Sequence, residues 1–393
     1  MAAETAKKFE ALERQAQTIM TVFTKAGHEA VAPAIIQPAG VFLDVIGETL
    51  RARTYVFSDP DGDELCLRPD LTVPICRLHL ERHPSGNVKA KYCYNGTAFR
   101  FQPEGASKAH PREFRQAGIE AFAATDREKA EAQTVATIID ALKAAGLTEF
   151  RLRIGDVGLL RALMKAADMP ERWRQRLLHH FWRPEAFRAE LKRLTTEPAV
   201  LLKNLPVELM AGIDPGNRPE AEKAVSRYLE KAGIEQIGVR SVTEIAANLC
   251  WIAADAKSDP LSAQTATLIE GYLGVTAPAR AAGARLKDMM RASSLDISAA
   301  LDTYHKRLQL LNDAGVDVVH ADFSAEFGRT LEYYTGFVFE IVTAELGDQS
   351  PVAGGGRYDS LMKAVGAPHD IAAVGAAIHT ERLLAAVSGA PAS

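Results

Sequence analysis

GGGRYDSLMKAVGAP (354–368) and AVGAAIHTERLLAAV (373–387) form a glycine-rich strand and helix unit close to the end of the 393-residue chain. The glycines lack the Gly-Lys-Ser/Thr ending of a phosphate loop and do not match the dinucleotide-binding fingerprint. Their simplest use is a tight turn or a close approach between backbone segments. Arg382, in the final helix, could hold a triphosphate through its planar guanidinium, although a lone arginine on a helix is more often solvated or paired.

Strand-like segments lie on both sides of a long helical block. Residues 30–157 and 315–393 contain short strand-forming runs separated by turns, and we expect them to build one sheet. Between them, 159–311 is rich in Ala, Leu, Arg, Lys and Glu at helical spacing. The sequence therefore predicts an α+β fold, with a core from 1–158 and 312–393 and a mainly helical insertion over 159–311.

The composition is that of an ordinary globular protein, with 47% hydrophobic and 24% charged residues. None of the four cysteines forms a Cys-x-x-Cys pair, which disfavours a disulfide framework or a metal site. A net charge of −4 argues against a dedicated nucleic-acid binder. No apolar run approaches the roughly 18–20 residues that span a membrane, and the N-terminus lacks the apolar stretch of a signal peptide. We expect a cytoplasmic protein that needs no cofactor and does not bind a membrane.

Two strand-like segments, VKAKYCYNGTAFRFQ and FRQAGIEAF, are separated by a polar loop and predict an antiparallel pair. Arg100 and Gln102 lie two positions apart in the first segment, so we expect their side chains on one face. Gln116 and Glu120 are separated by an even interval in the second segment and should also share a face. This pair of strands is therefore a candidate floor for a binding site.

Glu120 stands in the otherwise apolar run AGIEAF, where an unpaired buried carboxylate would be costly. Binding the ammonium group of an amino acid or an amine would explain it. A structural ion pair with a nearby arginine would explain it as well, and ion pairs are the usual partners of buried charges. The residues alone leave both explanations open.

Two further segments combine polar and aromatic side chains. LRPDLT places Asp70 and Thr72 at the end of a strand, where they could bind a ligand or simply build a turn. RTLEYYTG places Arg329, Tyr333 and Tyr334 ahead of an apolar strand. Such a cluster can hold a flat ring, although two tyrosines at the start of a strand are commonly packing residues.

Taken in order along the chain, these motifs resemble those of class II aminoacyl-tRNA synthetases, and in detail those of histidyl-tRNA synthetase. LRPDLT resembles that family's LRPEGT, and FRFQP…HPREFRQAGIE resembles its FRxE…RxREFHQxGxE. RTLEYYTGFVFE resembles its RGLDYYTGTVFE, and GGGRYD…AVGAAIHTERLL resembles its GGRYD…AVGFAxGLERL. The resemblance extends over residues 30–387 and implies a class II synthetase-like antiparallel sheet flanked by helices.

The resemblance also assigns a histidine pocket. The positions that match it are Asp70, Thr72, Arg100, Gln116, Glu120, Arg329, Tyr333 and Tyr334. By resemblance, Glu120 and Gln116 would lie near the ammonium of histidine, Arg329 and the two tyrosines near its imidazole, and Arg100 near its carboxylate. The positions that remain at the nucleotide end are Gln102, Arg112 and Arg382.

The chain departs from the synthetase mainly at this nucleotide end. Gln102 stands where the family has the glutamate that contacts adenine, and His379 replaces a small glycine of the nucleotide pocket. Asp70 is one methylene shorter than the family's glutamate and is followed by Leu71 instead of glycine. Only eleven residues follow Arg382, fewer than the roughly 50 that a domain needs. We therefore expect no anticodon-binding domain, no tRNA binding and no aminoacylation.

A second resemblance accommodates these departures. The regulatory subunits of short-form ATP phosphoribosyltransferase are similar to a histidyl-tRNA synthetase without its last domain and often carry LRPDLT. This resemblance implies a non-catalytic subunit with no catalytic residues that self-associates as a dimer, assembles as a hetero-octamer with a short-form catalytic subunit, activates it and mediates feedback inhibition by histidine. Two alternatives stay open: a truncated histidyl-tRNA synthetase-like enzyme that forms histidyl-adenylate, and a sensor of uncharged tRNA.

Overall fold

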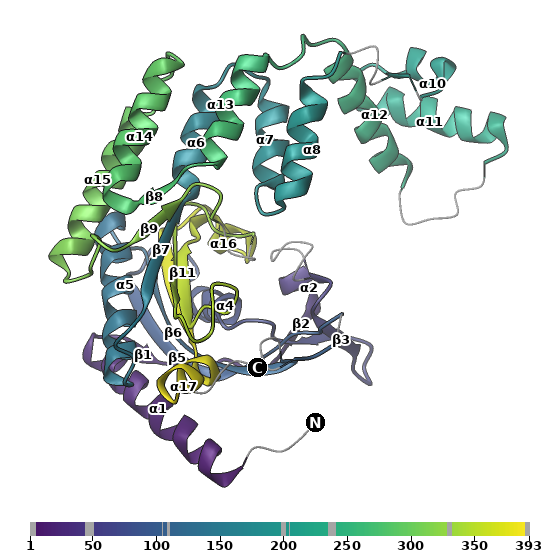
Figure 1. Cartoon of the computed structure of the whole chain (residues 1–393). Coiled ribbons are helices and arrows are strands. Elements are labelled where there is room, and N and C mark those ends of the chain that lie inside the picture. Colours follow the sequence, from purple (N-terminus) through teal and green to yellow (C-terminus); the bar gives the residue numbers. More distant parts are fainter. Residues whose placement is uncertain are drawn as a thin grey trace. The chain divides into compact units, whose positions relative to one another are not determined.

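The chain folds into two compact units, which are described separately (Figure 1). The computed structural model describes residues 5–43, 51–103, 105–107, 111–197, 202–203, 205–234, 241–327 and 332–389. The first unit comprises Met1–Ala167 and Gly271–Ser393, and the second comprises Asp168–Glu270. The second unit is therefore shorter than the helical region over 159–311 that the sequence indicates. Arg329 lies outside the described residues.

A nine-stranded sheet forms the centre of the first unit, in the order β1-β5-β6-β12-β11-β10-β7-β9-β8. The strands are β1 Glu29–Ala30, β5 Ala90–Phe99, β6 Glu113–Phe122, β7 Arg151–Asp156, β8 Thr276–Pro278, β9 Asp322–Ser324, β10 Phe337–Val342, β11 Ala353–Arg357 and β12 Ala373–His379. Neighbours from β5 through to β7 are all antiparallel. Among the strands of the described residues, only the pairs β1–β5 and β7–β9 are parallel. The sheet thus has the expected antiparallel centre with mixed edges.

A second, small sheet has the strand order β2-β4-β3. Its strands are β2 Ile36–Pro38, β3 Tyr55–Ser58 and β4 Glu64–Leu67, and the helices next to it in the chain are α2 Ala39–Leu43 and α4 Thr72–Arg82. The β3–β4 hairpin turns at Gly62, whose φ of 91° suits glycine.

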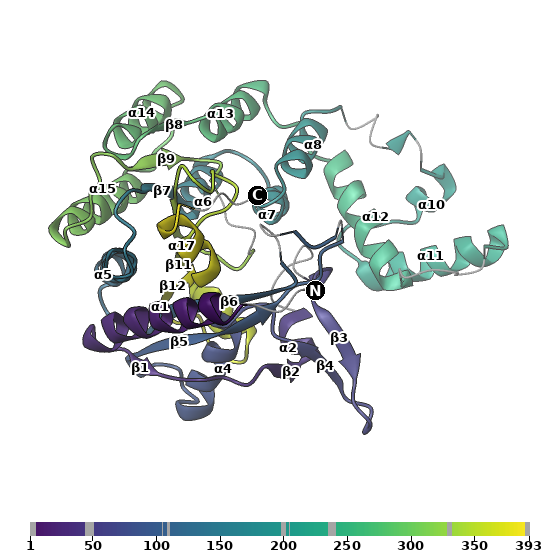
Figure 2. The same cartoon turned by 60° about the horizontal axis from the view of Figure 1, so that its bottom comes forward.

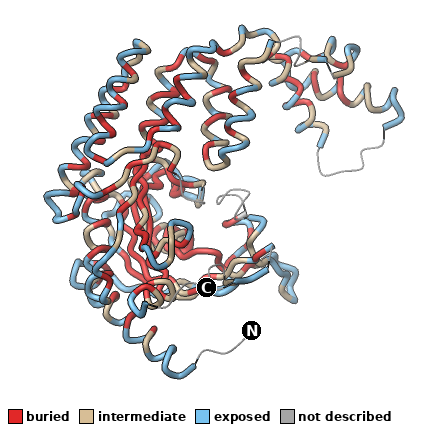
Figure 3. The backbone as a smooth tube through the Cα atoms, in the orientation of Figure 1, coloured by how far each residue is buried: buried red, intermediate tan, exposed pale blue. Residues whose placement is uncertain are grey.

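Helices pack against the large sheet, as Figure 2 shows. They are α1 Ala6–Lys25, α5 Arg127–Ala144, α6 Val157–Ala166, α14 Ala279–Ala292, α15 Ser298–Asp313, α16 Asp359–Ala364 and α17 Thr380–Val387. Helix α1 is amphipathic, with Leu12, Ile19 and Phe23 fully or almost fully buried on one side. Burial is continuous through the central strands, so the core of this unit lies around the sheet (Figure 3).

The second unit is helical in its described residues. It contains α7 Glu171–His180, α8 Pro184–Leu194, α10 Val207–Ala211, α11 Arg218–Ala232, α12 Val242–Ala256 and most of α13 Ala263–Leu273. A buried carboxylate, Asp255, accepts hydrogen bonds from the Trp173 indole and from three arginines, Arg172, Arg176 and Arg193. This cluster ties α7, α8 and α12 together.

Within the residues that the structure describes, no helix is both long enough and apolar enough to cross a bilayer. The same residues contain no group of three or more His, Cys, Asp or Glu side chains placed to hold a metal ion. The four cysteines are buried free thiols.

Candidate ligand-binding site

Side chains from the start of α4 and from several strands of the large sheet converge on a small cavity of about 20 Å³. Its lining residues are Asp70, Thr72, Tyr94, Arg100, Gln116, Tyr333, Tyr334, Gly354, Tyr358, Gly375, Ala376 and Ala377. Six residues of the sequence-based candidate set are among them, although they come from segments far apart in the chain. A space of this size admits about one water molecule.

Glu120 lies directly beneath this cavity and is held by three hydroxyl groups. Thr72 donates to Oε1 over 2.8 Å and Tyr94 donates to the same oxygen over 3.3 Å, while Tyr358 donates to Oε2. The side chain is 1% exposed. No arginine or lysine of the described residues pairs with it, so the alternative explanation of a structural ion pair with an arginine is not found among them.

Burial raises the pKa of Glu120 to about 8, because removing water disfavours the charged form. Hydrogen bonds from Tyr358, Thr72 and Tyr94 oppose this shift, whereas the nearby Asp70 adds to it. Hydroxyl donors satisfy the oxygens without supplying a positive charge. The carboxyl group is therefore mostly protonated at neutral pH, and a cation that approaches it would favour its charged form.

Asp70 is the second buried carboxyl group at this cavity. Its Oδ1 accepts a hydrogen bond of 3.1 Å from the backbone N–H of Val73, in the first turn of α4. Its Oδ2 is buried and has no hydrogen-bond partner among the described residues. Burial raises the pKa of Asp70, opposed by the Val73 amide and the charge of Arg100. An acceptor left unsatisfied in this way is costly, so the site is suited to a ligand that donates hydrogen bonds.

Glycines allow the polar side chains to cross the sheet surface. A Cβ atom at Gly375 would lie 1.6 Å from Oε2 of Glu120, and one at Gly118 would lie 2.4 Å from the Tyr94 hydroxyl. A Cβ atom at Gly355 would lie 2.1 Å from the carbonyl oxygen of Gly375. Real Cβ atoms do not approach other atoms so closely. The glycines thus serve close approach, which is one of the two uses that the sequence left open for the glycine-rich segment.

Aromatic side chains form one wall of the cavity. The rings of Tyr333 and Tyr334 are 4.9 Å apart and tilted, and both residues are buried. Tyr333 also meets Tyr358 edge-on, with ring centroids 5.8 Å apart. Burial raises the pKa of Tyr333 and Tyr358 well above its ordinary value, so both hydroxyls remain protonated donors.

Tyr94 and Tyr358 are site residues that the sequence reasoning missed. Tyr94 pairs with Gly118 in the β5–β6 register, so it shares the sheet face of Glu120. That alternation was visible in YCYNG and could have identified it. Tyr358 lies inside GGGRYD, a motif that was interpreted from its glycines. Nothing in the sequence near this motif indicates that Tyr358 contacts Glu120, 238 positions away in the chain.

The structure corrects the placement of Arg100 and Gln102. Strand β5 ends at Phe99, so both residues follow the strand instead of lying within it. The Arg100 Nε donates to the carbonyl of Pro69 over 3.0 Å. Gln102 is buried, and it donates to the carbonyl of Pro111 over 2.9 Å.

Two of the residues predicted at the nucleotide end, Gln102 and Arg382, form hydrogen bonds with other protein groups. Arg53 donates to the Gln102 carboxamide oxygen, so both ends of that side chain are engaged. Arg112 is exposed, and Arg382 donates to the carbonyl of Pro351 over 2.9 Å. These residues do not converge on the small cavity.

His379 closes the end of β12 and is 9% exposed. Its ring lies 5.4 Å from that of Phe114, and the guanidinium of Arg100 lies 5.0 Å from the centre of the same Phe114 ring. A glycine here would leave this space open. The imidazole instead packs against the aromatic ring beside the cavity.

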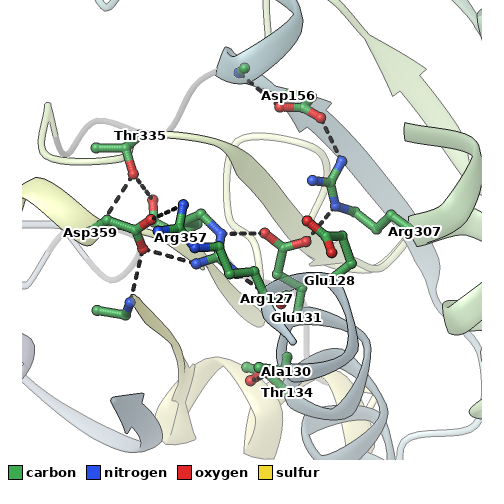
Figure 4. Close-up of polar contacts among 12 residues, drawn as sticks. Arg127, Glu128, Ala130, Glu131, Thr134, Asp156, Arg307, Thr335, Arg357 and Asp359 are labelled. Carbon is green, nitrogen blue, oxygen red and sulfur yellow. Dashed lines mark hydrogen bonds and ion pairs between the residues drawn. The ribbon is translucent and has the colours of Figure 1, made fainter. Parts of the chain in front are cut away.

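An ionic network lies behind the site (Figure 4). Glu131 on α5 is fully buried and accepts from Arg357 and Arg307, each over 2.5 Å. Arg307 also binds Asp156, and Arg357 binds Asp359 over 2.9 Å. Tyr358 follows Arg357 directly, so this network fixes the backbone from which the Tyr358 hydroxyl reaches the cavity.

Comparisons with known proteins identify the family to which this chain belongs. The family model described as "Histidyl-tRNA synthetase" matches residues 3–214 and 249–383. An ATP phosphoribosyltransferase regulatory subunit of Brucella anthropi is 32% identical over 356 residues, which are 90% of this chain and 92% of that protein. The protein of the same name from Mesorhizobium japonicum is 33% identical over 380 residues, or 96% of this chain and 98% of that protein.

Solved structures confirm the fold class. An ATP phosphoribosyltransferase regulatory subunit/histidyl-tRNA synthetase from Bacillus halodurans superposes with a TM-score of 0.69 at 20% identity, covering 98% of this chain and 82% of that one. Histidyl-tRNA synthetase from Nostoc superposes with a TM-score of 0.60 at 16% identity, covering 95% and 70%. With its histidyl-tRNA synthetase-like fold and this similarity over nearly its whole length, the chain belongs to the family of ATP phosphoribosyltransferase regulatory subunits.

Proposed function

We propose that this chain is a non-catalytic regulatory subunit of a short-form ATP phosphoribosyltransferase, which acts in the first step of histidine biosynthesis. In this role it activates a catalytic partner subunit and mediates feedback inhibition by histidine. The shared name of its relatives supports the regulatory role. The observation that carries the histidine part is the pair of buried carboxyl groups at the small cavity, one of which has an unsatisfied oxygen.

The pocket offers a complementary partner for each part of histidine. The α-ammonium would donate to Asp70 Oδ2 and stabilise the charged form of Glu120. The imidazole would lie against the rings of Tyr333 and Tyr334. The carboxylate would approach Arg100, which lines the same cavity. Arg329 keeps its proposed place near the imidazole on the strength of the motif alone.

Histidine is much larger than the roughly 20 Å³ cavity, so binding requires the lining side chains to move. A ligand that binds only after the lining side chains move can act as an effector, because it favours the conformation in which they have moved. A ligand shifts a conformational equilibrium only by the difference between its affinities for the two states. An open pocket in the inhibited complex and a closed pocket in the active complex would supply that difference.

The contacts of Gln102 and His379, where the related synthetases bind the nucleotide, support the proposal that this chain is not catalytic. Gln102 is bonded at both ends to protein groups, and His379 packs on Phe114. An adenine base would have to displace these contacts. The alternative, a histidyl-tRNA synthetase-like enzyme that forms histidyl-adenylate, rests on the family model and on the presence of Arg100 and Arg382.

Reconstitution with a short-form catalytic subunit tests the proposal. We expect this chain to raise the phosphoribosyltransferase activity of that subunit and to make it sensitive to histidine. Glu120→Gln should keep the activation and lose most of the sensitivity. Histidine-dependent exchange of pyrophosphate into ATP by this chain alone would overturn the non-catalytic assignment and favour the adenylate-forming alternative.

An exposed apolar surface supports the proposed self-association into a dimer within a hetero-octamer. The small sheet and the segment after β5 expose large apolar side chains: Ile35, Ile36, Val56, Phe57 and Phe101. Tyr55 pairs through Leu67 with Ile36 and meets the ring of Phe101, so Ile36, Phe57 and Phe101 share one side of this sheet, and Val56 faces the other. Exposed apolar groups on one side of a sheet commonly mark interfaces. Light scattering during size-exclusion chromatography should report a dimer for this chain, and Phe57→Ser should shift it toward the monomer.

A further inference from the structure

A second, larger cavity of about 410 Å³ lies in the first unit, away from the site described above. It is bounded by the end of α1, the start of β5, the end of β6 and the first turns of α5. Lys91 pairs with Ala121 and Tyr92 pairs with Glu120 in the β5–β6 register. Because side chains alternate along a strand, Lys91 and Ala121 face the side of the sheet opposite to Glu120. The two cavities are therefore separate.

The rim of this cavity is positively charged. Three lysines line it, Lys89, Lys91 and Lys129, against a single carboxylate, Asp126. Asp126 is already engaged, since it caps α5 and lies 3.5 Å from Lys306. Lys89 donates to the Thr125 hydroxyl over 3.2 Å. Neither Lys91 nor Lys129 forms an ion pair within the described part of the chain, so two ammonium groups remain available to an anion.

His28 adds a hydrogen-bond acceptor to the wall. It is 7% exposed, and its Nδ1 lies 3.2 Å from the carbonyl oxygen of Phe23. Burial, together with the charge of Lys91, lowers the pKa of His28 to about 4, so the ring is neutral at physiological pH. A neutral ring that donates from Nδ1 carries a lone pair on Nε2. This nitrogen has no partner among the described residues and would accept from a ligand hydroxyl.

The rest of the lining divides into an apolar floor and a polar wall. Ala121 supplies the floor, whereas Ala90 and Phe122 border the cavity from positions whose side chains face the opposite side of the sheet. Gln133 and Thr137, on successive turns of α5, supply polar groups on the wall. A cavity of this volume with convergent polar groups has the dimensions of a small-metabolite site.

We propose that this cavity binds a phosphorylated sugar, with the phosphate held by Lys91 and Lys129 and the sugar hydroxyls bonded to His28 and to the polar side chains of α5. Lysine is a common ligand for phosphate, as a point charge on a flexible stem. The neutral imidazole would accept from a sugar hydroxyl, and the polar side chains of α5 would bind further hydroxyls, so a sugar phosphate would make contacts that the phosphate group alone does not make. The proposal is independent of the histidine pocket and of the catalytic partner.

Calorimetric titration of the full-length protein tests this proposal, with ribose 5-phosphate, inorganic phosphate and ribose as probes. We expect saturable one-to-one binding of ribose 5-phosphate, tighter than that of either fragment. Lys91→Gln and Lys129→Gln should each raise its dissociation constant about tenfold or more, because each removes a charge-assisted hydrogen bond. Lys165→Gln, an exposed lysine on α6, is the matched control and should leave the constant unchanged.

Absence of saturable ribose 5-phosphate binding would overturn the proposal. Unchanged binding in both cavity variants would do the same, since the ligand would then bind elsewhere. Inorganic phosphate binding as tightly as ribose 5-phosphate would reduce the cavity to a general anion site and would also contradict the proposal. Circular dichroism of each variant checks that its fold is retained, which we expect because these lysines are exposed.

Discussion

Thr72 donates a hydrogen bond of 2.8 Å to Oε1 of Glu120, although the two residues are 48 positions apart in the chain. Thr72 is the first residue of α4, and Glu120 lies near the end of β6. This contact joins the start of a helix to the floor of the sheet. Because the donor is a neutral hydroxyl, the carboxyl group keeps a capacity for a cationic ligand that an arginine partner would have removed.

Glu120→Gln should weaken histidine binding by about 10- to 100-fold, since a hydrogen bond to a charged group contributes about 1.5–3 kcal/mol. The amide keeps the shape of the side chain but cannot become an anion. Isothermal titration of histidine measures the change. Glu113→Gln, at the exposed start of the same strand, is the matched control and should bind as the wild type does. Equal affinities in all three proteins would show that Glu120 does not contact the ammonium.

Histidine affinity should rise with pH up to about 8, because the ammonium favours the ionised form of Glu120. Below that pH, binding must displace a proton, so the affinity should fall by up to about tenfold per pH unit. Titrations in buffers of different ionisation enthalpy should report proton release near neutral pH. In Glu120→Gln this release should vanish. A pH-independent affinity in the wild type would contradict the assignment.

The same carboxyl group should make the free protein less stable as pH rises. Its pKa is near 8 when folded and ordinary when unfolded, so the folded state binds more protons between these values. The contribution of Glu120 to stability is therefore most favourable below the ordinary pKa of glutamate. It becomes less favourable as pH rises toward 8, by about a few kcal/mol. Urea unfolding between pH 5 and 8.5 measures this slope. Glu120→Gln should flatten it.

Alternation along β6 was enough to predict that Gln116 and Glu120 share one face, because that property is local to a strand. The partners of Glu120 were not predictable in the same way. Thr72, Tyr94 and Tyr358 come from three elements, and only the assembled sheet brings their hydroxyls together.

For Arg100 and Gln102, the local pattern predicted a strand that the structure does not have. The alternating FRFQ segment is typical of a strand, yet β5 ends at Phe99. Arg100 donates to the carbonyl of Pro69, and Gln102 donates to the carbonyl of Pro111. Hydrogen bonds of this kind depend on the tertiary structure, so the sequence around the two residues does not indicate them. The histidine pocket was therefore easier to anticipate than the nucleotide end.

Gly375→Ala should destabilise the protein by about 1–3 kcal/mol and impair histidine binding. The added Cβ would lie 1.6 Å from Glu120 Oε2 and 2.7 Å from the carbonyl oxygen of Ile119, and the latter cannot move without disturbing the sheet. Gly271→Ala is the control, because its Cβ would make only an ordinary contact of 3.8 Å with Met289. Urea unfolding and histidine titration measure both effects. A Gly375→Ala protein that matches the control would mean that the strands separate more readily than this packing implies.

Arg307→Met should cost about 3–5 kcal/mol of unfolding free energy, because it leaves the buried carboxylate of Asp156 without a charged partner and removes one of the two arginines that pair with Glu131. Arg14→Met removes an arginine from an exposed ion pair with Glu10 and should cost less than about 1 kcal/mol. Because Glu131 also holds Arg357, the residue before Tyr358, Arg307→Met should weaken histidine binding in addition to stability. Denaturant unfolding and titration on the same samples separate the two effects. Lost stability with unchanged histidine affinity would show that the network supports the fold but does not position Tyr358 at the cavity.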